Sequence, residues 1–137
     1  MTFPPGVAQT LLRNIRAAGG ATFDPEGRPA DPGDLWLYPR HPGRTLILDP
    51  SADWGAALTD FVEQHRPLVE QAEDDDWLAF GAWIHPGGSL YLDIVTGRPS
   101  RQEAVREAVR AGEREGRRVA AIYRASTGQT LTLQPPL

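Results

Sequence analysis

The stretch FGAWIHPGGSLYLDIV, residues 80–95, decides the fold of this chain. Two runs of alternating residues flank Pro86-Gly87-Gly88, and a three-residue connection of this kind closes antiparallel strands. Successive side chains of a strand point to opposite faces, so pairing Ile84 with Leu90 gathers six apolar side chains on one face. These six are Phe80, Ala82, Ile84, Leu90, Leu92 and Ile94. The pattern predicts a β-hairpin with one face in the core.

The opposite face of this hairpin carries the pocket candidates Trp83, His85, Tyr91 and Asp93. The register places Trp83 opposite Tyr91, His85 opposite Ser89 and Gly81 opposite Asp93. An imidazole, a carboxylate and two aromatic rings are the groups of a small polar pocket. The alternative is an ordinary cross-strand aromatic pair, with His85 merely beside the turn and far from Asp93 along the ladder.

A helix follows the hairpin. Ser100-Arg-Gln-Glu103 forms a capping box, which predicts a helix over residues 101–115 that ends at Gly116. Its expected buried stripe contains Val105, Ala108, Val109 and Gly112. Strands are expected at residues 119–123 and 130–133. Strand, helix and strand in this order predict a right-handed crossover, with the strands around Leu92 and Ala121 parallel.

The first half of the chain adds two helices and further strands. Helical spacing of apolar residues predicts helices over residues 5–18 and 54–66. Pro67 limits the second helix, with residues 67–72 as one further helical turn in the alternative. Residues 21–23 read as a short strand, and residues 34–38 and 45–49 as a second hairpin. We therefore expect a single α+β domain over residues 1–137, with a mostly antiparallel sheet, one βαβ crossover and about three helices.

The second predicted hairpin carries the candidates for contact with a partner. Both of its strands are apolar on both faces, which indicates either a strand pair covered on both sides or one face left for a partner. Its loop mixes arginine with aromatic residues, a composition typical of protein interfaces and of single-strand stacking surfaces. The partner-binding candidates are Trp36, Tyr38, Arg40, His41 and Arg44. The alternative is a Pro-Gly turn with solvated arginines.

Composition excludes several classes of site. The chain has no cysteine, so disulfides and thiolate metal sites are excluded, and its three histidines match no zinc spacing. The net charge of −4 argues against a nucleic-acid partner. No apolar run is long enough for a membrane span, and the start of the chain lacks a secretion signal, so we expect a cytoplasmic protein. The acidic run at residues 73–76 reads as a solvated linker, and we expect neither a metal nor a cofactor.

Three segments together resemble a known group of proteins: residues 20–27, residues 80–93 and residues 101–108. They are similar to small proteins of phages and mobile elements from GC-rich bacteria. Those proteins typically read Gly-Gly-Trp-x-Asp, a turn, Val-Tyr-Leu-Asp-Val, a helix with Glu-Ala, and a strand ending in Asp. This chain departs from that pattern at Ala82, His85 and Arg124. The resemblance implies an accessory protein of a mobile element and carries no reaction.

Two classes of function stay open. The first is a non-enzymatic binding protein that docks on another macromolecule, a protein of the host or of a defence system. The second is a small enzyme acting on a nucleotide or another anionic metabolite, with His85 as acid or base and arginines on the phosphate. An enzyme requires a concave pocket that holds His85 within hydrogen-bond reach of a second polar group. A docking protein requires only an exposed, partly apolar patch.

Overall fold

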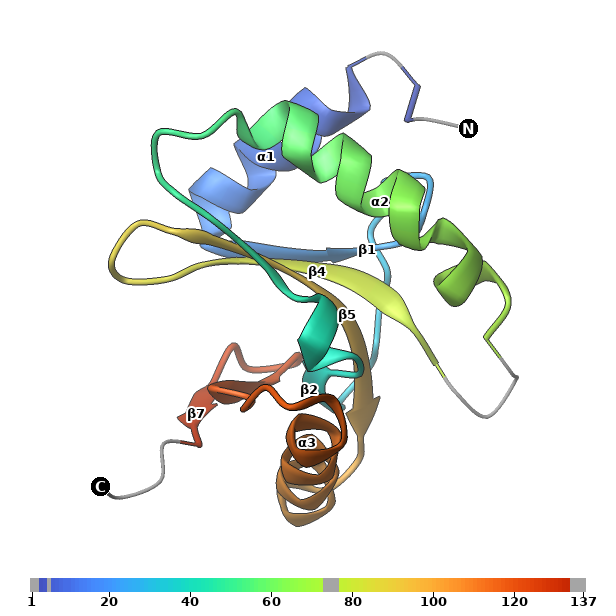
Figure 1. Cartoon of the computed structure of the whole chain (residues 1–137), viewed down its shortest axis with the longest axis vertical. Helices are drawn as coiled ribbons and strands as arrows, with labels where there is room; N and C mark the ends of the chain where they lie inside the picture. Colours follow the sequence, from blue (N-terminus) through green and yellow to red (C-terminus); the bar gives the residue numbers. More distant parts are fainter. Residues whose placement is uncertain (1–2, 5, 73–76, 134–137) are drawn as a thin grey trace.

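The computed structural model describes residues 3–4, 6–72 and 77–133. In these residues three helices pack on a seven-stranded sheet whose strand pairs are antiparallel (Figure 1). The helices are α1 Val7–Ala18, α2 Trp54–Glu70 and α3 Arg101–Glu115. The strands are β1 Gly20–Phe23, β2 Trp36–Pro39, β3 Leu46–Leu48, β4 Ala79–Ile84, β5 Leu90–Arg98, β6 Ala121–Arg124 and β7 Thr130–Thr132, and a short 3-10 helix, η1 Pro42–Arg44, separates β2 from β3. The predicted α+β class is confirmed.

The hairpin of β4 and β5 has the predicted register, with Ile84 opposite Leu90 and Ala82 opposite Leu92. Its apolar face lies beneath α1 and α2, where Phe80, Leu90 and Leu92 have no exposed surface. Complete burial of a side chain of this size stabilises the fold by about 1.5 to 3 kcal/mol. This face of the hairpin is therefore the main core of the molecule.

The prediction of a second hairpin from residues 34–38 and 45–49 is wrong. The strand order is β1-β4-β5-β2-β6-β7, and β3 pairs with β5 instead of with β2. Both β2 and β3 run antiparallel to β5, one after the other, with Pro39 opposite Val95 and Leu46 opposite Leu92. The segment between them is long enough for a hairpin loop, but η1 returns the chain to the same edge of β5 instead.

The predicted crossover joins β5 to β6 through α3, and both strands run antiparallel to β2, which lies between them. They therefore point in the same direction without pairing. The predicted stripe of α3 was partly wrong, because Val109 is 48% exposed. Small residues form the buried face instead: Ala104, Ala108, Ala111 and Gly112. Their size leaves room for two large rings of β2, Trp36 and Tyr38.

The helix ends follow the predicted chemistry, and of the two alternatives at Pro67 the structure shows the further helical turn. The Ser100 hydroxyl accepts a hydrogen bond from the Glu103 N–H at 3.0 Å, and Gly116 ends α3 with a φ of 69°, a conformation that favours glycine. Pro67 does not end α2, which continues to Glu70. Val69, beyond the proline, is buried in the core, and this burial offsets the lost helical hydrogen bond.

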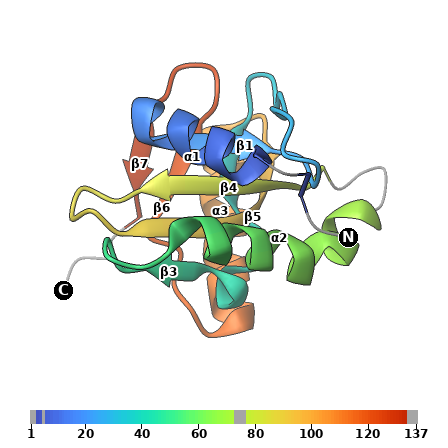
Figure 2. The same cartoon turned by 90° about the horizontal axis from the view of Figure 1, so that it is seen from above.

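One face of the sheet carries all three helices. α1 lies over β1 and α2 over β5 (Figure 2), while α3 packs on β2 and its neighbours β5 and β6. The side chains beneath these helices share one face of the sheet. Tyr38 of β2 lies opposite Thr96 of β5, and Thr96 points to the same face as Ile94, two residues before it. Among the described residues no helix lies over the other face, which is concave (Figure 1). Across the described ranges, no helix has the length and apolar character needed to cross a membrane.

Candidate functional site

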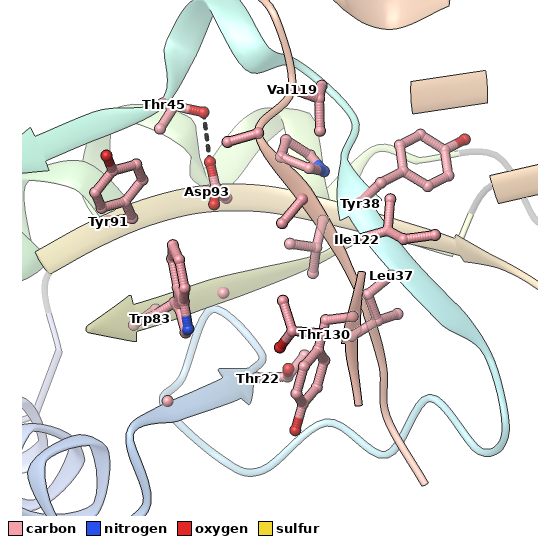
Figure 3. Close-up of a pocket in the computed structure, with 18 of the residues that line it drawn as sticks. Thr22, Leu37, Tyr38, Thr45, Trp83, Tyr91, Asp93, Val119, Ile122 and Thr130 are labelled. Carbon is pink, nitrogen blue, oxygen red and sulfur yellow. Dashed lines mark hydrogen bonds between the residues drawn. The ribbon is translucent and has the colours of Figure 1, made fainter. Parts of the chain in front are cut away.

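A cavity of about 590 Å³ occupies the concave face of the sheet. Residues of all seven strands of the described sheet border it, among them Thr22 of β1 and Thr130 of β7. Because β1 and β7 are the two outer strands in the strand order, the sheet curves until both of its ends border one cavity. Figure 3 shows these two threonines below Asp93 and to the right of Trp83. The space resembles the lumen of an incompletely closed barrel.

Aromatic rings form one corner of this cavity. Trp83 and Tyr91 meet edge to face, with ring centroids 5.4 Å apart and ring planes at 71°. His85 stacks on Tyr91 at 5.5 Å, but it is exposed and does not line the cavity. Its Nδ1 atom accepts a hydrogen bond from the Gly87 N–H at 3.0 Å, inside the turn. Of the four predicted pocket residues, Trp83, Tyr91 and Asp93 therefore lie together in the wall, and His85 lies outside.

Asp93 places a carboxyl group beside this corner (Figure 3). The Thr45 hydroxyl donates a hydrogen bond to its Oδ1 atom, and Arg117 donates from Nη1 to the Thr45 carbonyl oxygen at 2.7 Å. Burial raises the pKa of Asp93 to about 6, and the Thr45 hydrogen bond and the Arg117 charge oppose this rise only in part. Asp93 thus changes its charge close to neutral pH.

Glu115, at the end of α3, holds the segment that carries Thr45. Its Oε2 atom lies 2.9 Å from the His41 Nδ1 atom, and its Oε1 atom accepts the Gly43 N–H at 2.9 Å. Burial alone would raise the pKa of Glu115, but these two hydrogen bonds and the charges of His41 and Arg114 together outweigh it and leave the pKa lowered. The Arg40 N–H donates to the Ile94 carbonyl oxygen at 2.7 Å and ties the start of the segment to β5. The segment that carries Thr45 is therefore held both by Glu115 of α3 and by the backbone of β5 next to Asp93.

The predicted partner-binding residues do not share one surface. Trp36 and Tyr38 are 6% and 2% exposed because strand alternation turns both rings toward α3. These two rings are therefore corrected from contact candidates to core residues. Arg40 and His41 are half-buried, and Arg44 is exposed. Contact of a partner with the remaining loop residues stays a prediction.

Four residues that border the cavity were not among the predicted pocket residues: Gly20, Thr45, Gly81 and Arg117. The strand glycines carried a usable signal, since glycine inside a strand often marks a close approach of backbone or ligand. Gly20 lies opposite Trp83 and Gly81 opposite Asp93, so both face the cavity. A Cβ atom on Gly81 would lie 2.9 Å from a methyl carbon of Val95. No local signal could have indicated Thr45 or Arg117.

No metal site is apparent in the described ranges, because no three His, Asp or Glu side chains converge there. The acidic run at residues 73–76 lies outside the described residues. Comparisons of the chain with protein-family models, with curated proteins and with solved structures find no match. The resemblance to phage and mobile-element proteins stays a prediction, and function has to be argued from the cavity.

Proposed function

We propose that the protein is a non-enzymatic binding protein whose ligand is a small organic molecule held in the concave face of the sheet. The cavity itself carries the proposal. Its volume of about 590 Å³ falls within the range of roughly 300 to 1,000 Å³ that is usual for ligand pockets. Its wall combines aromatic and aliphatic side chains with few polar groups, as such pockets do.

The uncovered sheet face supports this proposal. A sheet of this kind normally buries one face and leaves a polar face in water. Here the free face presents Trp83, Tyr91 and Val95 around a hollow. Gly20 and Gly81 also lie on this face, and because they have no side chains, the hollow is not filled there. Apolar walls around an unfilled space forgo packing energy, so the arrangement is better suited to a ligand than to stability.

The enzyme alternative loses its predicted acid or base, since His85 lies outside the cavity. A phosphate would also meet the Asp93 carboxylate in the wall, and like charges repel. An enzyme at this site would have to use Asp93, whose pKa of about 6 suits acid–base chemistry near neutral pH. Its only hydrogen-bonded side-chain partner among the described residues is Thr45. Ligand binding without catalysis is therefore the simpler function for a cavity with these wall residues.

Docking on another macromolecule stays a separate prediction. The exposed part of the original candidate surface is Arg44. The next strand, β3, exposes Leu46 and Ile47 by 37% and 43%, but on opposite faces of the sheet, with Ile47 on the cavity face. If a partner protein docks here, Arg44→Ala should reduce its co-purification from the native host, whereas Arg13→Ala, on an exposed part of α1, should not.

A fragment screen with a blocked-cavity variant tests the proposed function. Thr22→Phe places a ring in the cavity from β1, and Thr10→Phe makes the same change on an exposed part of α1. Fragments that bind the unmodified chain, detected by ligand-observed NMR, should bind Thr10→Phe equally and lose at least about tenfold in affinity for Thr22→Phe. Thermal unfolding checks that both variants are folded. Fragments that bind both variants equally would contradict the proposal.

A further inference from the structure

We propose that the ligand of the cavity is an organic cation, an ammonium or guanidinium group carried on an aromatic or aliphatic body. This inference rests on the proposed function and names the chemical class of its ligand. Three observations support it: the position of the Asp93 carboxylate, the engagement of the arginine beside it, and the adjoining aromatic corner.

The carboxylate of Asp93 has one oxygen left for a ligand. Oδ1 accepts the Thr45 hydroxyl, and no described residue donates a hydrogen bond to Oδ2. Asp93 lies on the cavity face of β5, opposite Gly81, so no side chain from β4 covers it directly. A buried or half-buried carboxylate is stable when a donor or a cation satisfies it. Oδ2 is not among the fully buried atoms that lack a partner, so it is open to a donor that enters the cavity.

The arginine beside Asp93, Arg117, does not pair with the Asp93 carboxylate. Arg117 directs its Nη1 atom at the Thr45 carbonyl oxygen, 2.7 Å away, and within the described ranges it forms no salt bridge with Asp93. Its charge is the smallest of the influences that act on the pKa of Asp93, and burial outweighs it. Asp93 therefore has no direct ionic partner among the described side chains, and its carboxylate can pair with a cation in the cavity.

The aromatic corner suits the same ligand. Trp83 and Tyr91 line the cavity on the same two strands as Gly81 and Asp93. The faces of such rings attract ammonium and guanidinium groups, and their area also covers apolar carbon. One short ligand with a cationic end and an apolar body can therefore contact the carboxylate and the rings together.

An anionic ligand is the strongest competing class, because Arg118 also borders the cavity and is exposed. An anion at Arg118 would leave Asp93 unsatisfied, and an anion near Asp93 would be repelled. A neutral ligand would use the rings and leave the charge of Asp93 without a counter-ion. The three classes are separated by probes of similar size and different charge.

The test uses phenethylamine, 2-phenylethanol and 3-phenylpropanoate, which share a ring and a two-carbon linker. At pH 7.5, NMR titration of the full chain should show that the amine binds at least about tenfold tighter than the alcohol, with the carboxylate weakest. Asp93→Asn should remove the preference for the amine and leave the affinity of the alcohol within about twofold. Asp60→Asn, an exposed change on α2, should keep the preference.

The failure of this inference can be told apart from failure of the proposed function. Equal binding of the amine and the alcohol, with loss of both in Thr22→Phe, would overturn the cation inference and leave the binding cavity standing. Tightest binding of the carboxylate would likewise overturn it in favour of an anion. Absence of binding by all three probes would overturn the inference, and an empty fragment screen in addition would overturn the proposed function.

Discussion

The carboxyl group of Asp93 stands in a wall of aromatic and aliphatic side chains, and this position affects stability. Because burial raises its folded-state pKa to about 6 from an ordinary value of 3.8, the folded state binds the proton more tightly than the unfolded state. The stabilising contribution is therefore complete below pH 3.8 and is lost as the pH rises through 6. A chain selected for stability alone would not keep this charge, which agrees with a role in binding.

Replacement of Asp93 by asparagine should reveal this effect. The amide side chain keeps an oxygen that accepts the Thr45 hydroxyl and carries no charge. Asp93→Asn should unfold with a free energy larger by about 1 to 3 kcal/mol at pH 7.5 and nearly unchanged at pH 4. Urea denaturation at both pH values measures the difference. Asp60→Asn is the exposed control, and a gain for Asp93→Asn that is the same at both pH values would contradict the raised pKa.

At the scale of elements, the interruption between β2 and β3 decides which groups meet Asp93. A continuous strand along β5 would place backbone there, whereas the detour through η1 brings the Thr45 hydroxyl to the carboxylate. The detour depends on Glu115, which binds both His41 and Gly43 from the end of α3. A contact at a helix end thus orders a residue of the cavity wall.

Glu115→Ala should loosen this segment without unfolding the molecule. Loss of two partly exposed, charge-assisted hydrogen bonds should cost about 1 to 2 kcal/mol. Hydrogen exchange at the Arg40 amide, which donates to the Ile94 carbonyl, should accelerate at least about fivefold. Glu113→Ala, an exposed change on the same helix, should leave that exchange rate unchanged. Equal exchange rates in the two variants would show that Glu115 does not anchor the segment.

Local patterns explain why some elements could be predicted from the sequence and others could not. The register of β4 and β5 follows from alternation across a short turn, where a shift by one residue would expose the core. The ends of α3 follow from Ser100 and Gly116, whose capping chemistry is local. The partner of β3 is a strand far away along the chain, and strands that are apolar on both faces fit several partners.

For the whole molecule, the two faces of the sheet have different tasks. The helix-covered face holds the core, and the concave face holds the cavity. Three of the four pocket candidates line the cavity, but its extent could not be predicted, because its far wall exists only where the curvature of the complete sheet brings β1 and β7 to the same space. The aromatic pair of Trp83 and Tyr91 was predicted correctly as a pair, but alternation along one hairpin does not show what lies across from it.

Two substitutions on adjacent strands test this division. Leu92→Asp places an unpaired charge in the core beneath the helices and should cost several kcal/mol, enough to unfold the chain at room temperature. Trp83→Ala removes a half-buried ring from the cavity wall and should cost less than about 2 kcal/mol. Circular dichroism and urea denaturation measure both changes. Equal damage by the two substitutions would mean that both faces are core.

The most direct test of the cavity as the binding site is the indole N–H spectrum of the tryptophans during a phenethylamine titration. Trp83 lines the cavity, whereas Trp36 lies under α3 and Trp54 lies in the core beside α1. Signals are assigned from single Trp→Phe variants in ¹H–¹⁵N spectra. We expect the Trp83 signal to shift in a saturable way while the Trp36 and Trp54 signals stay in place. Saturable shifts of Trp36 or Trp54 with an unmoved Trp83 signal would contradict the assignment of the concave cavity as the binding site.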